Sequence, residues 1–189
     1  MDKRAAWGAA LAFLLVMLQF GCIRLSPSAA AVRIVLPATI ALVPVALWPY
    51  RRRAGVWMMF VGLAANLAAI LANGGLMPIE RATVVSAAGE ERAARYVSGR
   101  WIPGSKDVLL APGDGHLVAL GDGIVLPMRR GGVVASPGDL VVWAGLAVLA
   151  GEASMAWQRR GRRERGGALG GPSYPLGSER AEGGASTLP

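Results

Sequence analysis

The chain has 189 residues, of which 53% are hydrophobic and only 17% are charged, and its formal net charge is +8. This composition, with its apolar residues gathered in long blocks, excludes an ordinary soluble domain. The single cysteine, Cys22, excludes an internal disulfide. We therefore expect a membrane protein.

Four blocks of the sequence approach the length and apolarity of a transmembrane helix. Such a helix needs about 20 mostly apolar residues to cross about 30 Å of hydrocarbon. The four blocks are residues 5–23, 29–48, 55–72 and 140–157. The sequence thus predicts an all-α membrane protein with four transmembrane helices, whose membrane domain comprises residues 1–157.

The first block also has another explanation. Lys3 and Arg4 before an apolar run fit a secretory signal, and the small residues of SPSAAA at 26–31 could offer a cleavage site. A signal peptide has a short apolar core, whereas this apolar run is longer than such a core. We therefore favour a first helix that is retained in the mature protein.

The basic residues predict the orientation of the helices. They cluster at 3–4, 51–53 and 159–165, which all lie at one side of the four predicted spans. Positive residues near helix ends are retained in the cytoplasm, so we expect both termini to be cytoplasmic. Most of the aromatic residues expected at the headgroup level lie at this same side. They are Trp7, Trp48, Tyr50, Trp57 and Trp157.

The net charge also invites a nucleic-acid interpretation. We do not favour it, because retention of positive residues in the cytoplasm already accounts for the basic clusters. The same clusters should attract anionic lipid headgroups at the inner face of the membrane. The expected partners are therefore the lipid bilayer, those headgroups and a membrane protein, with no nucleic acid.

Residues 158–189 form the predicted tail. The tail begins with basic residues, and after Arg165 it is rich in glycine and proline. It has few large apolar groups, and burying those few would not offset the entropy lost on ordering. We expect a disordered cytoplasmic tail.

Among the polar residues inside the predicted spans we single out Arg33, Asn66 and Glu152. Ionisable residues inside a span are functional candidates, because burying a charge in lipid is costly. However, Arg33 is near the outer end of its helix and can extend to the headgroups, and Glu152 is about two turns from the inner arginines. For Glu152 we favour a structural role, such as pairing with the arginines at 51–53, over transport chemistry.

We call residues 74–138, on the expected extracytoplasmic side between the third and fourth spans, the outer segment. At its start, Asn73, Gly74 and Gly75 fit a left-handed helix cap and a turn, and Pro78 can begin a short helix through PIERATVVSAAG. Further on, KDVLLAPGDGHLVALGD is typical of a small β-hairpin. Where the segment ends, Ser136 or Asp139 can cap the fourth helix.

Four short blocks in this region resemble a known family. They are NGGLMPI at 73–79, KDVLL at 106–110, LGDGIVLP at 120–127 and SPGD at 136–139. These blocks, their order and the three spans before them resemble those of a bacterial membrane family known as domain of unknown function 5317. The resemblance covers roughly residues 1–157, and it implies the architecture and a place in the bacterial inner (cell) membrane but no activity. The structural-motif candidates are Asn73, Gly74, Gly75, Pro78, Lys106, Asp107, Gly121, Asp122, Pro127, Ser136, Pro137, Gly138 and Asp139.

Several acidic residues of the outer segment and its borders could also take part in chemistry. Asp107, Asp114, Asp122 and Asp139, together with His116, could in principle hold a divalent cation or act as acids and bases. Asp and Gly beside Pro are also turn formers, and one histidine makes no zinc-ligand set. We therefore favour a structural role for these residues.

Ser105 next to Lys106 raises the idea of a serine–lysine hydrolase, yet adjacency in sequence does not provide the geometry of a nucleophile and its base. We assign no catalytic, metal or cofactor-binding residue and expect no cofactor. The sequence favours a non-enzymatic membrane component or partner-binding protein with an ordered outer segment. The alternative is a membrane enzyme or small-solute transporter that uses the Asp-rich outer loops.

Overall fold

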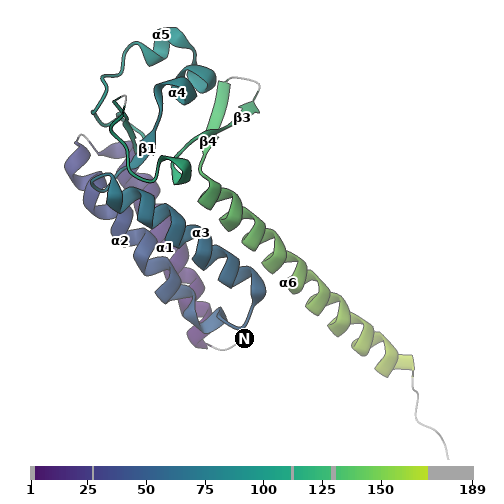
Figure 1. Ribbon diagram of the computed structural model, residues 1–189. Coiled ribbons are helices and arrows are strands. Elements are labelled where there is room, and N and C mark those ends of the chain that lie inside the picture. The colour runs from purple at the N-terminus through teal and green to yellow at the C-terminus, as the bar shows by residue number, and fades with distance from the viewer. Residues whose placement is uncertain (1–2, 27, 112, 129–130, 170–189) are drawn as a thin grey trace, which may run out of the picture. The chain divides into compact units, whose positions relative to one another are not determined.

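A computed structural model describes residues 3–26, 28–111, 113–128 and 131–169 (Figure 1). Contacts divide the chain into two units, Met1–Gly151 and Glu152–Pro189. The first unit contains three long helices, the outer segment and the first part of the last long helix. The last helix continues to Leu169 in the second unit, past the predicted start of the tail at residue 158, and the rest of the predicted tail lies outside the described residues.

Within the described residues, four helices are long and apolar enough to cross a membrane. These are α1 (Lys3–Leu25), α2 (Ala29–Leu47), α3 (Ala54–Ala72) and α6 (Pro137–Leu169), and a short 3₁₀ helix, η1 (Trp48–Tyr50), follows α2. Their apolar stretches run over 6–25, 29–50, 54–72 and 137–158. The sequence prediction of four such helices is confirmed, with every boundary within about three residues.

Helices α1, α2 and α3 lie side by side as a bundle (Figure 1). Between α1 and α2 the backbones approach closely at Gly8, because a Cβ atom there would collide with the carbonyl oxygen of Ala46. The hydroxyl of Thr39 in α2 also lies 3.0 Å from Gln19 Oε1 of α1. Large apolar side chains such as Phe13 of α1 are exposed on the outside, as expected for side chains that meet lipid.

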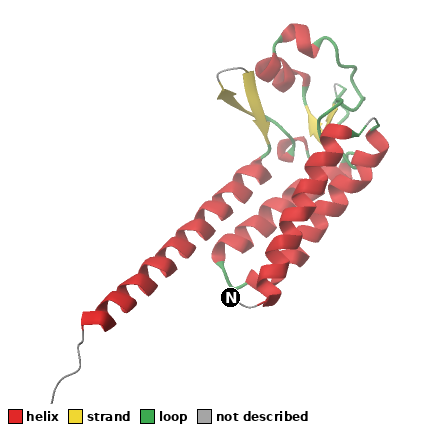
Figure 2. Cartoon of the chain, turned by 180° about the vertical axis from the view of Figure 1, so that it is seen from behind, coloured by secondary structure: helices red, strands yellow, loops and turns green. Residues whose placement is uncertain are grey.

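The outer segment contains two pairs of short strands and several short helices. In chain order it comprises β1 (Met77–Ile79), α4 (Arg81–Ala88), α5 (Glu90–Ala93), β2 (Asp107–Leu109), η2 (Val118–Leu120), β3 (Ile124–Met128) and β4 (Gly131–Ala135). Strands β1 and β2 are parallel, and β3 and β4 are antiparallel. Figure 2 shows both pairs at the same end of the α1–α3 bundle.

The prediction that Pro78 begins a helix is wrong. Pro78 lies in β1, and α4 begins at Arg81. Strand pairing decides this outcome, because Met77 N donates to Lys106 O at 2.9 Å and Leu110 N donates to Ile79 O at 2.9 Å. These hydrogen bonds reach a distant part of the chain, so local helix signals around Pro78 could not reveal them.

The predicted hairpin within 106–122 is also wrong. Strand β2 pairs with β1, and the region that was predicted to be the second strand contains η2 instead. A hairpin does exist, but it joins β3 to β4, with Ile124 opposite Ala135. The apolar pattern after Lys106 marks β2 correctly, but it carries no information on which segment pairs with that strand.

Two clusters of buried apolar side chains organise the first unit. One joins the bundle to the outer segment, since it contains Leu36 of α2, Ile70 of α3, Met77 of β1 and Val108 of β2. The other lies inside the outer segment around Ile79 and its neighbours. Full burial of one such side chain contributes about 1.5–3 kcal/mol, so the first cluster fixes the outer segment firmly on the bundle.

Candidate functional site

The corner at the end of α3 is formed by two glycines. Gly74 has φ of 71° and Gly75 has φ of 87°, so both are left-handed, whereas Asn73 has φ of −115°. Gly75 N donates to Ile70 O at 2.9 Å and closes the helix end. A Cβ atom on Gly75 would lie 2.5 Å from Arg33 O, so this corner packs directly on the backbone of α2.

The Asn73 side chain ties a distant loop to α3. Its Nδ2 donates to Ala69 O and to His116 O, both at 2.7 Å, and its Oδ1 accepts from His116 N at 3.2 Å. The backbone of His116, rather than its imidazole, therefore makes this contact. The Asn73 side chain thus connects α3 of the bundle to the Asp114–His116 loop.

Strand β1 brings two of the motif blocks together. On one side Met77 N donates to Lys106 O at 2.9 Å, and on the other Asp122 N donates to Pro78 O at 3.0 Å. Gly121 makes the second approach feasible, because a Cβ atom there would lie 2.5 Å from Pro78 O. The chain therefore places Lys106 and Asp122 on either side of a three-residue strand.

Four charged residues meet at this point, and we call Lys106, Asp107, Asp122 and Asp139 the Lys106 cluster. Lys106 Nζ lies 3.0 Å from Asp122 Oδ1 and 3.3 Å from Asp139 Oδ2. The Asp122 side chain is only 2% exposed, and those of Lys106 and Asp139 are about a quarter exposed. One lysine thus links the loop before β2, the loop before β3 and the first turn of α6.

The beginning of α6 is capped as the sequence predicted. Ser136 Oγ accepts from Asp139 N at 3.0 Å, and Asp139 Oδ2 accepts from Ser136 N at 3.1 Å. This reciprocal arrangement satisfies two backbone donors at a helix start, and Pro137 occupies the first helical position, where no donor is needed. Asp139 therefore serves both the helix cap and the Lys106 cluster.

Asn66 extends the polar network into α3. Its Nδ2 donates to Asp139 Oδ1 at 2.7 Å, and its Oδ1 accepts from the hydroxyl of Ser136 at 2.8 Å. Both Asn66 and Ser136 are buried. Gly138 leaves room for this contact, because a Cβ atom on it would collide with Asn66 Oδ1. The network was not predicted, although a single amide in an otherwise apolar helix was a usable signal for it.

Burial sets the ionisation of the cluster. It raises the pKa of Asp122 to about 7, although the Lys106 ammonium lowers it, and it also raises the pKa of Asp107. Burial alone would lower the pKa of Lys106, but the surrounding carboxylates together raise it above its usual value. Lys106 therefore stays charged, whereas Asp122, with a pKa of about 7, is present near neutral pH in both its protonated and its ionised form.

Asp107 is the least satisfied member of the cluster. Its Oδ2 accepts a hydrogen bond from the Ser105 hydroxyl, and its backbone N donates to Ser105 Oγ at 3.1 Å. Its Oδ1 is buried without a hydrogen-bond partner. A protonated carboxyl tolerates this surrounding far better than a carboxylate does, in agreement with the raised pKa.

The geometry bears on the chemistry considered for these residues. The Ser105 hydroxyl is engaged by Asp107, and Lys106 Nζ by Asp122 and Asp139, so the structure does not pair Ser105 with Lys106 as nucleophile and base. Throughout the described ranges, no group of three or more His, Cys, Asp or Glu side chains could hold a metal ion. In the cluster the ammonium group of Lys106 balances the negative charge of the aspartates, which is the part that a metal ion would otherwise take.

The remaining candidates lie apart from the cluster. Pro127 is exposed in β3, opposite Gly132 of β4. Arg33 lies one turn into α2 beside the Gly74–Gly75 corner. Glu152 begins the second unit, and its pairing with the arginines at 51–53 stays a prediction.

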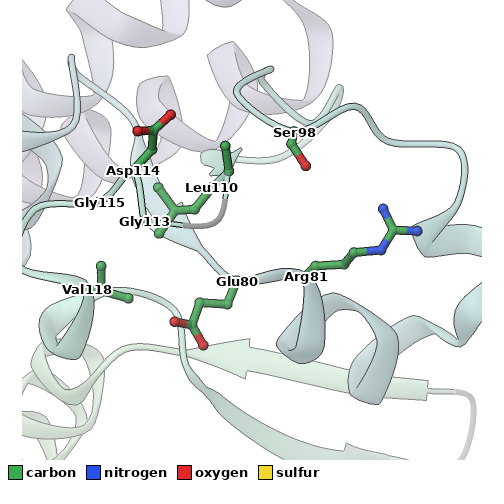
Figure 3. Close-up of a pocket in the computed structure, with 9 residues that line it drawn as sticks. Glu80, Arg81, Ser98, Leu110, Gly113, Asp114, Gly115 and Val118 are labelled. Carbon is green, nitrogen blue, oxygen red and sulfur yellow. The ribbon is translucent and has the colours of Figure 1, made fainter.

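A separate pocket of about 340 Å³ lies in the outer segment (Figure 3). Its polar lining residues include Glu80, Arg81, Ser98 and Asp114. Figure 3 shows the Glu80 and Arg81 side chains extending in different directions from adjacent positions of the backbone, with Asp114 across the pocket. No member of the Lys106 cluster lines this pocket.

In the part of the chain that the structure describes, four helices are long and apolar enough to cross a membrane, and a lysine–aspartate cluster connects the outer segment to two of them. A family model described as a family of unknown function, DUF5317, matches residues 3–150, so the chain belongs to the DUF5317 family. This match confirms the resemblance found in the four sequence blocks and includes every residue of the Lys106 cluster. No curated protein and no solved structure matches the chain.

Proposed function

We propose that this protein is a non-enzymatic membrane component whose outer segment is a rigid platform for a membrane-protein partner or for envelope material. The observation that carries the proposal is that the charged groups of the Lys106 cluster are engaged with one another inside the protein. Lys106, Asp122 and Asp139 bind one another inside the protein, and they do not line the pocket shown in Figure 3. Charged groups that could have formed a reaction site instead join the outer segment to α3 and α6.

The surface of the outer segment supports contact with a partner. Val97, Met128 and Val133 are large apolar side chains that are between 41% and 66% exposed. Met128 and Val133 belong to the β3–β4 hairpin. These exposed apolar side chains are the candidate points of contact with a partner.

A photo-crosslinking experiment tests the platform. A photoreactive amino acid would replace Val97, Met128 or Val133 in intact cells, with Leu14 on the exposed face of α1 as the lipid-facing control. We expect a discrete adduct of one mass from the outer-segment positions but not from Leu14. The absence of a discrete adduct from all three outer-segment positions in a correctly folded protein would contradict the proposal.

We infer further that the protein lies in the bacterial inner (cell) membrane with both termini in the cytoplasm. The basic clusters at 3–4, 51–53 and 159–165 support this orientation. In a Cys22→Ser background, a membrane-impermeant thiol reagent applied to intact cells should label Val133→Cys and spare Arg51→Cys. The reverse labelling pattern would overturn the orientation.

The second candidate function is a membrane enzyme or small-solute transporter that uses the Asp-rich outer loops. The pocket in Figure 3 favours it, because its volume of about 340 Å³ suits a small ligand and acidic and basic groups line it. A thermal-shift screen of small solutes separates the two functions. A solute that stabilises the parent but not Asp114→Asn would favour the second candidate, whereas adducts from Val133 that persist in Asp114→Asn would favour the platform.

A further inference from the structure

A second cavity, of about 430 Å³, lies where the outer end of α2 meets the outer segment. Ala29 and Arg33 of α2 and Gly99, Arg100 and Trp101 of the outer segment line it. The lining therefore includes two arginines and no acidic residue. Two arginines beside one cavity favour an anion as its occupant, because guanidinium groups form strong hydrogen bonds to anionic oxygens.

Arg33 is positioned for an anion at the level of the lipid headgroups. It lies four residues inside the apolar stretch that begins at Ala29, which is about one turn or 6 Å from its end. The position at which a Cβ atom on Gly74 would lie is 3.4 Å from Arg33 Nη1, so the side chain extends over the corner toward the outer segment. A charged side chain near the end of a span normally reaches the headgroup region in this way.

Within the described ranges, neither arginine of the cavity forms an ion pair. Ion pairs among the described residues include those of Arg81 with Glu90, of Arg95 with Glu91, and of Lys106 with its two aspartates. Arg33 and Arg100 take part in none of these pairs. An arginine inside a span usually has a partner, and a group from outside the chain would supply one for Arg33.

The Trp101 side chain, which lines one side of the cavity, is held in place by its contacts. Its indole Nε1 donates to Ser105 O at 2.7 Å, and its ring packs against the apolar cluster that joins the bundle to the outer segment. Tryptophan also prefers the interface between lipid and water. The cavity therefore has one rigid amphipathic side at the depth where headgroups lie.

The surroundings favour a lipid over a free anion. Ile34 follows Arg33 and is 70% exposed, and Leu25 at the nearby end of α1 is 84% exposed. Such apolar side chains at the end of a span can carry acyl chains, which a free anion lacks. We propose that Arg33 and Arg100 bind the phosphate of an anionic phospholipid in the leaflet beside the outer segment.

This site differs from the lipid attraction expected of the basic clusters at the opposite helix ends, because it is a cavity with defined walls. It also does not depend on the platform function. A lipid held there would join α2 to the loop at 99–101 and so stabilise the seat of the outer segment on the bundle. The two guanidinium groups can each donate two hydrogen bonds to phosphate oxygens.

Hydrogen exchange in nanodiscs provides a local test. The parent protein would be placed in nanodiscs of phosphatidylcholine alone or with phosphatidylglycerol, and exchange would be followed in peptides covering 97–105. We expect phosphatidylglycerol to slow exchange there, and Arg33→Gln and Arg100→Gln each to abolish that slowing. Arg92→Gln, which removes an arginine outside the cavity, should retain it.

Lipid retention provides a quantitative readout. In native mass spectrometry, each cavity substitution should lower the ratio of bound phosphatidylglycerol to phosphatidylcholine about fivefold, with no such drop for Arg92→Gln. Arg100→Gln lies in an exposed loop and should fold even if Arg33→Gln does not. Equal exchange in the two kinds of nanodisc would overturn the site, and full protection by inorganic phosphate in phosphatidylcholine nanodiscs would overturn its assignment to lipid.

Discussion

Single residues in this protein are placed by contacts that span large distances in sequence. Lys106 interacts with Asp122 and Asp139, and Asn73 fixes the backbone of His116. Removing one partner of a buried charge pair typically costs about 3–5 kcal/mol, because the other charge is left uncompensated. The motif residues are therefore best understood by what they join.

Asp122 should make stability depend on pH. In the folded protein its pKa is about 7, so between about pH 4 and 7 the folded state holds a proton that the unfolded state has released. Stability should therefore fall as pH rises through this range. Asp122→Asn should flatten the decrease in melting temperature between pH 5 and pH 8 and remain folded, since the amide oxygen can still accept from Lys106.

The matched control for this experiment is Asp114→Asn in the outer loop, which should keep the parent's pH dependence. Part of the decrease should remain in Asp122→Asn, because burial also raises the pKa of Asp107. If the melting temperature of Asp122→Asn were as sensitive to pH as that of the parent, the raised pKa of Asp122 would not be the source of the pH dependence.

The two glycines of the corner should respond differently to alanine. Both have positive φ, which costs an alanine about 1–2 kcal/mol. A Cβ atom on Gly75 would in addition lie 2.5 Å from Arg33 O, whereas on Gly74 the nearest atom, 3.4 Å away, is the mobile end of the Arg33 side chain. Gly75→Ala should therefore lower the melting temperature and membrane abundance clearly more than Gly74→Ala, and equal losses would contradict this account.

At the scale of elements, α3 and α6 approach through glycines spaced seven residues apart. A Cβ atom on Gly55 would collide with Gly145 O, and one on Gly62 would lie 2.5 Å from Gly138 O. Small residues at such an interface let backbones pack closely where lipid gives no hydrophobic driving force. This approach also carries Asp139 to Asn66 and so completes the polar network.

Gly62→Ala should thus destabilise the protein, although alanine normally stabilises a helix interior by about 1 kcal/mol relative to glycine. The reason is that α6 would have to move away from α3. Gly21→Ala in α1 is the control, because a Cβ atom there meets nothing within 4 Å. Melting temperatures in one detergent decide the outcome, and a neutral or stabilising Gly62→Ala would contradict the close packing of α3 and α6.

The helices and strands also show which structural features could be predicted from the sequence. The four apolar helices were predictable because length and composition are local properties, and the same holds for the Ser136–Asp139 cap and the glycine corner. The pairing of β1 with β2 was not predictable, because its hydrogen bonds join residues that are far apart in the chain. For the same reason the sequence named Lys106, Asp122 and Asp139 as motif residues without revealing that they meet.

At the scale of the first unit, apolar and polar contacts both hold the outer segment against the helices. The cluster around Leu36, Ile70 and Met77 joins the bundle to the strands, and the Lys106 cluster joins the strands to α3 and α6. Both kinds of contact hold the outer segment in one position relative to the unit's helices. A platform for a partner requires this rigidity, since ordering a loose segment would reduce binding affinity.

Hydrogen exchange of the parent and of Lys106→Met in lipid nanodiscs tests this account most directly. If the Lys106 cluster holds the outer segment in place, the amides of Met77, Ile79, 107–109 and Asp122 should exchange slowly in the parent and faster together in Lys106→Met, with the middle parts of α1 and α2 unchanged. The joint change is expected because removing the ammonium leaves the buried Asp122 carboxyl group and the partly buried Asp139 carboxyl group without their shared partner. Fast exchange of these amides in the parent, or a change confined to residues next to position 106, would contradict the claim that the cluster holds the outer segment on the bundle.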